Sequence, residues 1–325
     1  MKVRLVAKWF ALAVFFAALP CWAGEVPIPP RIHVVPLYAP YMSFKELGHG
    51  PRIEIFVPSF PGPRVFDVFL SEGFFGVGAR PGQVAGAPWV LSSKDKIVLN
   101  NVKWDRLPGG ALAFSQSGTR GRYRLSGRIT ATPYVVDLRA DLQNLNSWPF
   151  RYALLNPGIA LRTTSGGVDP RDSHFDPFFA DFSLNRVFYY SSRGWTPLRK
   201  IFTPSRTGAD NTRSFALGGV PQPLLPADPF SARPVPIATS FPAGLAPTLG
   251  VMAAVSQDRQ WVVGIAWQDA ARIASNALWP CMHVMPRVEN VPPGKSAHFH
   301  GRLYFLHGTL NDLLVLVNRD LGASK

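Results

Sequence analysis

Hydrophobic and polar residues alternate with a period of two along much of this chain. Between residues 52 and 57, Ile53, Ile55 and Val57 occupy every second position, and residues 65–70 repeat the pattern. Successive side chains of a strand point to opposite faces, so this alternation predicts strands with one buried face. No helical periodicity of comparable length occurs in this part of the chain.

The clearest run of strands is predicted between Trp89 and Phe150. Residues 111–116 and 122–132 flank a loop that contains glycine, as in a β-hairpin. Residues 134–142 alternate apolar side chains with Asp137, Arg139 and Asp141. An arginine row on the strand before them, at 122, 124 and 128, is either a solvated face that pairs with these carboxylates or a patch for anions. Further hairpins are expected at 186–198 and 249–267.

The stretch from Trp279 to Leu321 combines a strand with a short helix. In the strand expected at 297–306, Phe299, Leu303 and Phe305 share one face, which belongs in a core. The helix is expected at 310–319. Thr309 precedes it, with Asp312 three residues later, which resembles a capping box.

Two segments are rich in proline and lack periodicity. Residues 24–51 predict an extended arm, because proline excludes a helix. Residues 203–247 hold nine prolines. A loop of this length inside a compact domain is usually functional or disordered, so we expect either an ordered loop beside a cleft or a mobile insertion.

The N-terminus has the features of an export signal. Three basic residues precede an apolar run at 9–19, and Pro20 and a small residue at Ala23 follow, which predicts cleavage after Ala23. The predicted organisation is therefore a signal at 1–23, the arm at 24–51, and one β-sandwich domain at 52–325 with the insertion at 203–247. Export leads to the periplasm or the cell exterior.

The signal holds three of the 34 basic residues and none of the 20 acidic ones, so the mature chain keeps a formal charge of +11. For an exported protein this favours a carbohydrate or an anionic envelope polymer as partner and disfavours nucleic acid. Charge that merely keeps the protein soluble is the alternative. Cys281 is the only cysteine after cleavage, which excludes an intramolecular disulfide and predicts a buried thiol.

One segment resembles a known family. Residues 136–146 read VDLRADLQNLN, and Pro149-Phe150 follows. This strand with an asparagine turn resembles galactose-mutarotase-like sandwich domains, and residues 175–195 and the C-terminal stretch are similar to a group of bacterial secreted proteins of that fold. The resemblance implies an all-β supersandwich, a large antiparallel β-sandwich, here with a short C-terminal helix. Mutarotases use a histidine acid and a glutamate base, and no pair here matches both motifs.

His174 is the candidate catalytic residue, with Asp176 as its acidic partner. It stands in the sequence Asp-Ser-His-Phe-Asp, and neighbouring carboxylates would raise the pKa of a histidine that acts as a general acid. An ordinary loop histidine gives the same pattern.

The second face of the strand at 297–306 is the candidate ligand-binding surface. It combines hydrogen-bond donors with an aromatic ring, as a groove for a sugar or an acid would. The predicted ligand-binding residues are His298, His300, Arg302, Tyr304, His283 and Trp279. Two histidines two residues apart also allow a zinc site made of His298, His300 and His283, although such pairs are common on exposed strands.

Three functions remain open at this point. The favoured hypothesis is an exported, non-catalytic protein that binds carbohydrate or a component of the cell envelope. The first alternative is a carbohydrate-active enzyme, an epimerase, hydrolase or lyase, and the second is a structural periplasmic protein. No cofactor motif and no membrane span after the signal are recognised, and the oligomeric state is left open.

Overall fold

The computed structural model describes residues 32–36, 51–61, 65–70, 74–80, 84–87, 102–118, 121–161, 178–179, 183–203, 212–218, 237–277 and 281–322. Every structural statement below concerns these residues. No helix among them is long and apolar enough to cross a membrane.

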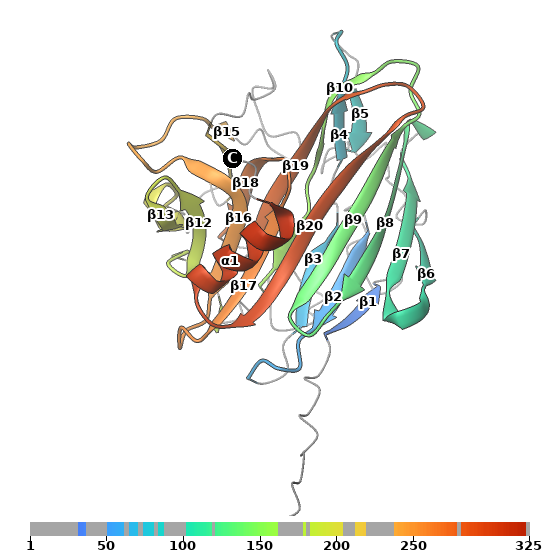
Figure 1. Cartoon of the computed structure of the whole chain (residues 1–325). Helices are drawn as coiled ribbons and strands as arrows, with labels where there is room; N and C mark the ends of the chain where they lie inside the picture. Colours follow the sequence, from blue (N-terminus) through green and yellow to red (C-terminus); the bar gives the residue numbers. More distant parts are fainter. Residues whose placement is uncertain are drawn as a thin grey trace, which may run out of the picture.

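The chain forms two large sheets (Figure 1). The first has eleven strands: β1 (His33–Pro36), β2 (Arg52–Phe56), β3 (Val65–Phe69), β11 (Gly158–Ala160), β19 (Cys281–Val291), β10 (Phe150–Leu155), β4 (Phe74–Val77) and β5 (Val84–Ala87) in that order, with β18 (Ala270–Asn276), β14 (Thr212–Ala216) and β15 (Ile237–Ala238) joined through β19. Only the β14–β15 pair is parallel among the described strand pairs.

The second sheet has nine strands. In order they are β13 (Gly194–Pro197), β12 (Val187–Ser191), β16 (Pro247–Val255), β17 (Trp261–Trp267), β20 (Ser296–His307), β9 (Val135–Asn144), β8 (Tyr123–Ala131), β7 (Leu112–Ser117) and β6 (Val102–Arg106). Short 3-10 helices lie at Pro108–Gly110 and Leu198–Lys200. The predicted hairpins are confirmed, and the all-β sandwich is confirmed with them.

The two sheets pack face to face over one hydrophobic core. Phe66 of β3 and Phe305 of β20 come from different sheets, and their ring centroids lie 5.1 Å apart. Phe299, Leu303 and Phe305 are all buried in this core, as their alternation predicts. Burial of apolar surface between the sheets is the main stabilising contribution.

The asparagine turn after β9 ties the sheets together at one end. The buried side-chain amide of Asn144 donates hydrogen bonds to the backbone carbonyls of Trp148 and Val291, each at 2.9 Å. Val291 ends β19 in the other sheet. The segment that carries the family resemblance therefore connects the two sheets.

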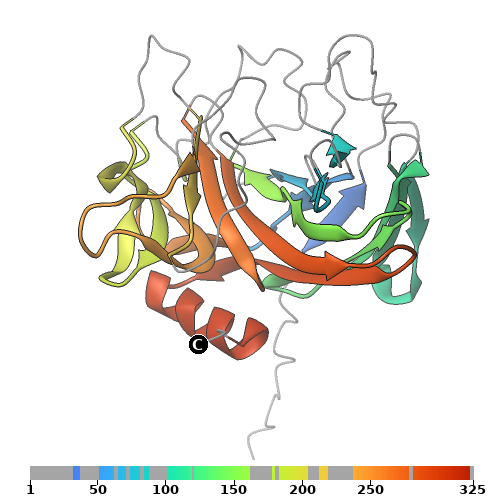
Figure 2. The same cartoon turned by 90° about the horizontal axis from the view of Figure 1, so that it is seen from above.

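The α-helix in the described part of the chain, α1 (Leu310–Leu321), follows β20, and its capping box between Thr309 and Asp312 is confirmed. Its buried side chains pack on the face of the nine-stranded sheet that points away from the main core. Figure 2 shows the helix on the far side of that sheet from the eleven-stranded one. A second, smaller core therefore forms beneath the helix.

The proline-rich segments contribute strands that their composition does not predict. In the N-terminal arm, β1 pairs with β2 at the edge of the first sheet. In the segment 203–247, β14 pairs along its whole length with β18. The prediction of a loop throughout 203–247 is wrong for these residues, because a partner strand can order a short segment that has no pattern of its own.

Candidate functional site

The candidate catalytic pair His174 and Asp176, and the ligand-binding candidate Trp279, lie outside the described residues. The enzymatic hypothesis that rests on His174 therefore stays a prediction. The remaining candidates fall on two different faces of the sandwich, and the structure separates them.

His298, His300, Arg302 and Tyr304 share the face of β20 that points away from the core, as predicted. Helix α1 covers the part of this face that holds Tyr304 and leaves the part that holds His298 uncovered. Arg302 forms an ion pair with Asp320 of the helix, with 2.7 Å between Nη1 and Oδ2, and Tyr304 is fully buried beside it. Burial, with the nearby negative charge of Asp320, raises the pKa of Tyr304.

The expected ligand-binding face is therefore too large, and this is a correction. Tyr304 lies in the small core beneath α1 and presents no surface to a ligand. Arg302 bridges Asp320 and Asp137, which fixes the helix against the sheet. The alternation of β20 shows which side chains share a face, but it does not show where a helix covers that face.

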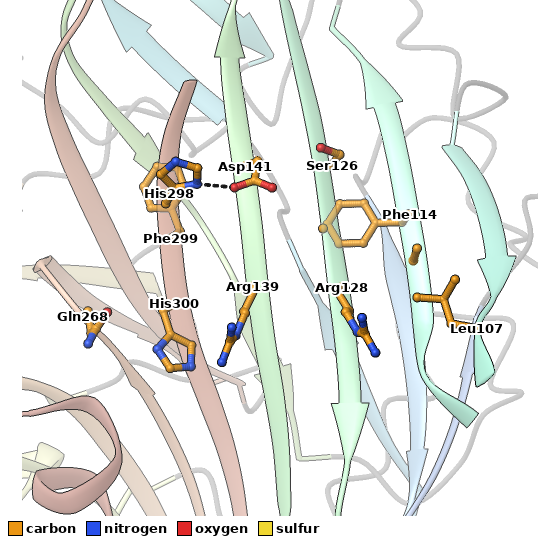
Figure 3. A pocket seen from close by; sticks show the side chains of 12 residues that line it. Leu107, Phe114, Ser126, Arg128, Arg139, Asp141, Gln268, His298, Phe299 and His300 are labelled. Atoms are coloured by element: carbon orange, nitrogen blue, oxygen red, sulfur yellow. Dashed lines mark hydrogen bonds and ion pairs between the residues drawn. The ribbon is translucent and has the colours of Figure 1, made fainter. Parts of the chain in front are cut away.

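His298 and His300 remain open and line a groove of about 830 Å³ on the outer face of the nine-stranded sheet (Figure 3). The imidazole of His298 donates to Asp141, and that of His300 donates from Nε2 to Asp137 at 2.8 Å. Both carboxylates come from β9; Asp141 stands directly opposite His298, whereas Asp137 stands opposite Arg302, two residues along β20 from His300. We name this surface the outer groove.

Asp137 lies on the same face of β9 as Arg139 and Asp141 and accepts hydrogen bonds from Arg139, His300 and Arg302. Partial burial alone would raise its pKa, but the hydrogen bond from His300 and the positive charges of Arg302 and Arg139 hold the pKa of Asp137 below its ordinary value. Asp137 is thus an ionised carboxylate shared by three basic side chains, which places them at fixed positions.

His283 lies on the other sheet, and this is a second correction. It stands on β19 and points to the face of the eleven-stranded sheet that is turned away from the core, since Met282 and Val284 on either side point into the core. His298 and His300 point outward from the opposite sheet. The three histidines therefore cannot share a zinc ion, and they do not converge on one concavity.

A row of side chains runs across the first sheet through His283. The strand registers place Arg52 opposite Phe69, Phe69 opposite Gly158, and Gly158 opposite His283. Directly opposed residues in a sheet share a face, so these four neighbours lie side by side on β2, β3, β11 and β19. We name this surface the buried row, because Arg52 is 7% and His283 is 5% exposed.

The arginine of the buried row is paired and stacked. Its Nε donates to Asp67 at 3.0 Å, a second hydrogen bond joins its Nη2 to the other oxygen of the same carboxylate, and its guanidinium lies 4.5 Å above the ring of Phe69. A two-point arginine–carboxylate pair fixes both planes. Glu54 stands opposite Asp67 on β2, and burial raises its pKa against the opposing charge of Arg52.

The imidazole of His283 continues this stack. Its ring is nearly parallel to that of Phe69, at 20° and 6.5 Å between centroids. Gly158 makes room for it, because a Cβ at this position would overlap the imidazole. Burial lowers the pKa of His283 to about 4, against a hydrogen bond to the backbone of Pro157. At neutral pH the ring is therefore uncharged, with one donor and one acceptor nitrogen.

The buried row continues into further polar groups on the same face. Arg272 of β18 is fully buried, and Arg287 of β19 pairs with Glu289 at 2.6 Å. Burial raises the pKa of Tyr152 to about 12, against the positive charges of Arg272 and Arg287 nearby. These groups border a small hydrophobic cluster on the same face, which includes Ala271 and Met285. Shifted pKa values in such groups occur at functional sites and in structural ion-pair networks alike.

The burial and mutual placement of most residues in the buried row cannot be predicted from the sequence. Arg52 and Asp67 occupy the polar positions of two alternating strands, which predicts exposed side chains. The two strands form a hairpin, so an ion pair between them could have been proposed from spacing. The placement of this ion pair in one row with His283 cannot be predicted from spacing, because it depends on β11, which joins β3 to β19.

Comparison with known proteins gives matches among solved structures. No protein-family model and no curated protein matches the sequence. Among solved structures, a galactose mutarotase related enzyme from Lactobacillus acidophilus aligns with 82% of this chain and 94% of its own, at 11% identity and a TM-score of 0.42. A galactose mutarotase-like protein from Lactobacillus casei aligns with 84% and 100%, at 9% identity and a TM-score of 0.42.

An alpha-N-acetylgalactosaminidase from Bifidobacterium bifidum aligns with 82% of this chain and 36% of its own, at 13% identity and a TM-score of 0.41. Two of these three proteins are described as galactose mutarotase related or galactose mutarotase-like, the family that residues 136–146 resemble.

Proposed function

We propose that this chain is an exported carbohydrate-binding protein that holds an uncharged part of a sugar on the buried row. The observation that carries the proposal is the alignment of Arg52, Phe69 and His283 in one register across the four neighbouring strands β2, β3, β11 and β19, on a face turned away from the core. The export signal and the non-catalytic role belong to the same proposal.

The charge balance of the buried row favours a neutral ligand. Arg52 is neutralised by Asp67, and His283 is uncharged at neutral pH. An anionic ligand would compete with Asp67 for the guanidinium and leave a buried carboxylate unpaired, which is costly. A polyhydroxylated ligand would add hydrogen bonds without disturbing the pair.

The hydrogen-bonding groups fit hydroxyls in number and type. A carboxylate offers about four lone-pair sites, of which Arg52 occupies two. The neutral imidazole of His283 is held in place by its hydrogen bond to the backbone of Pro157. The ring of Phe69 contacts the guanidinium of Arg52 and stacks with the imidazole of His283, which limits the movement of both groups. Neighbouring sugar hydroxyls both donate and accept, so they can be recognised by fixed groups of this kind.

A glycan array probed with the exported chain tests the proposal, followed by calorimetry with the best neutral hit. The His283→Gln variant is expected to bind that hit at least tenfold more weakly, because its side chain cannot reproduce the ring. The matched control is His298→Gln on the outer groove, with an expected change below twofold. Thermal melting checks that both variants fold. An array without any hit would exclude the proposal.

The export part of the proposal has its own test. Expression of residues 1–325 in a bacterium and intact-mass analysis of the recovered protein should give a chain that begins at Gly24. A chain that retains residues 1–23 would contradict this part and would leave the binding experiment unaffected.

A further inference from the structure

Two arginines face each other across neighbouring strands in the outer groove. Arg128 of β8 pairs directly with Arg139 of β9, and both side chains are exposed on the face away from the core. The Cα atoms of opposed residues lie roughly 4.5–5.5 Å apart, and like charges at such positions destabilise a sheet. His300 of β20 stands opposite Arg139 and extends the row to three basic side chains.

The carboxylates nearby do not neutralise this row. Asp137 accepts from Arg139 at 3.1 Å, but it also accepts from His300 and from Arg302. Asp141 accepts from His298, the other histidine of the groove. In the described part of the chain, the guanidinium of Arg128 has no ion pair and no hydrogen bond.

The row lies inside a concave surface. Arg128, Arg139 and His300 all line the outer groove, and Ser126 adds a hydroxyl beside them. Figure 3 shows the three basic side chains turned toward the same end of the strands. Strands are about 4.8 Å apart, so a row across three of them spans roughly 10 Å. A ligand in the groove can contact all three groups.

We propose that the outer groove binds an acidic polysaccharide, through the carboxylate or sulfate groups that its units carry. The planar guanidinium matches such groups with two parallel hydrogen bonds. One anionic group between Arg128 and Arg139 removes their repulsion, and His300 with Ser126 supplies donors to the adjoining unit. The polymer lies across β8, β9 and β20, in line with the row.

The groove favours a polysaccharide over other polyanions. Its two phenylalanines, Phe114 and Phe299, are each only 4% exposed, so neither offers its ring for the stacking that single-stranded nucleic acid uses. The basic groups lie in a recess rather than on a projection, so a flat lipid surface would contact them poorly. A flexible chain of sugars can follow the recess.

This inference is independent of the proposed function. The outer groove and the buried row lie on opposite faces of the sandwich and share no residue, so a protein without a neutral-sugar site could still bind an acidic polymer here. The two sites also predict opposite ligand charge, which allows them to be tested separately.

The test is binding of polygalacturonate to the exported chain, measured at low salt. The double variant Arg128→Gln/Arg139→Gln is expected to weaken binding at least tenfold. The matched control is Arg199→Gln/Lys200→Gln, two exposed basic residues beyond β13 at the other edge of the same sheet, with an expected change below twofold. Both double variants lose two charges, so net charge alone cannot separate them.

Any binding of neutral dextran should not depend on Arg128 and Arg139, whereas dextran sulfate should bind with the same dependence on these residues as polygalacturonate. Several outcomes would overturn the proposal. Equal weakening by both double variants would show attraction to net charge only. Tighter binding to phosphatidylglycerol vesicles or to single-stranded DNA, with the same dependence on the groove, would assign a different partner. Absence of polygalacturonate binding at low salt would exclude the site.

Discussion

Arg52 and Arg139 are both arginines on strand faces that point away from the core, yet their surroundings differ. The side chain of Arg52 is 8% exposed, held by both oxygens of Asp67 and stacked on Phe69. That of Arg139 is 69% exposed, bonded once to Asp137, and faces another arginine. A buried charge must be paired within the protein, whereas an exposed one is stabilised by water.

The difference indicates what each face can bind. In the buried row the arginine is paired with a carboxylate of the protein, so this face can offer hydrogen bonds to a ligand but little net charge. The outer groove leaves positive charge available, so it can attract an anion. Two polar faces of one sandwich are therefore suited to ligands of different charge.

The largest expected difference is in stability. Arg52→Ala leaves Asp67 buried without its partner and should lower the free energy of unfolding by about 3–5 kcal/mol. Arg139→Ala on the outer groove should lower it by less than about 1 kcal/mol. Urea denaturation measures both. Equal losses would contradict the distinction between the faces.

The pH dependence of stability sharpens the contrast through His283. Its pKa is about 4 in the folded chain against an ordinary 6.5, so between these values the unfolded chain takes up a proton that the folded chain does not. The contribution of the neutral His283 to the free energy of unfolding is therefore fully present above pH 6.5. Below pH 6.5 the free energy of unfolding should fall by about 1.4 kcal/mol per pH unit, until about pH 4.

The variant His283→Gln should lose this component. The difference in unfolding free energy between wild type and variant is therefore expected to vary with pH in the window from 6.5 to 4 and to be flat above it. Denaturant melts at four pH values provide the comparison. A difference that stays constant through the window would mean that His283 is not held neutral by burial.

A smaller loss of stability is expected from a substitution at Gly158, which lies directly against the imidazole of His283. In Gly158→Ala the new methyl group overlaps His283, which should cost about 1–3 kcal/mol by overpacking. A double-mutant cycle with His283→Ala tests the cause. The cost of the alanine at 158 should largely disappear when the ring is absent, and additive losses would argue against the contact.

The smallest effect is expected at His298. Its imidazole is 80% exposed and its partner Asp141 is 54% exposed, so the pair is screened by solvent. His298→Gln should change the free energy of unfolding by no more than about 0.5 kcal/mol. A loss comparable to that of Arg52→Ala, measured in the same urea experiment, would show that the outer groove has a structural role.

The sequence predicts much of the fold, because alternation is a local property. The hairpins, the core face of β20 and the capped helix α1 all follow from residues close together in the chain. The strands β1 and β14 are missed, because their pairing depends on distant partners rather than on their own pattern.

The site is predicted less well for the same reason. Alternation places His298 and Tyr304 on one face, but the burial of Tyr304 depends on where α1 packs. Closeness in the sequence suggests that His283 and His298 belong to one site, but their strands, β19 and β20, belong to different sheets. The buried row requires the registers of β2, β3, β11 and β19 together, and no local pattern contains them.

The most direct test of the account compares Arg52→Lys with Arg139→Lys in their binding to the neutral sugar found on the array. Lysine keeps each charge but loses the planar two-point pair, on which only the buried row depends. Calorimetry on folded variants is predicted to show at least tenfold weaker binding for Arg52→Lys and less than a twofold change for Arg139→Lys. The reverse order, or equal affinities, would contradict a sugar site on the buried row.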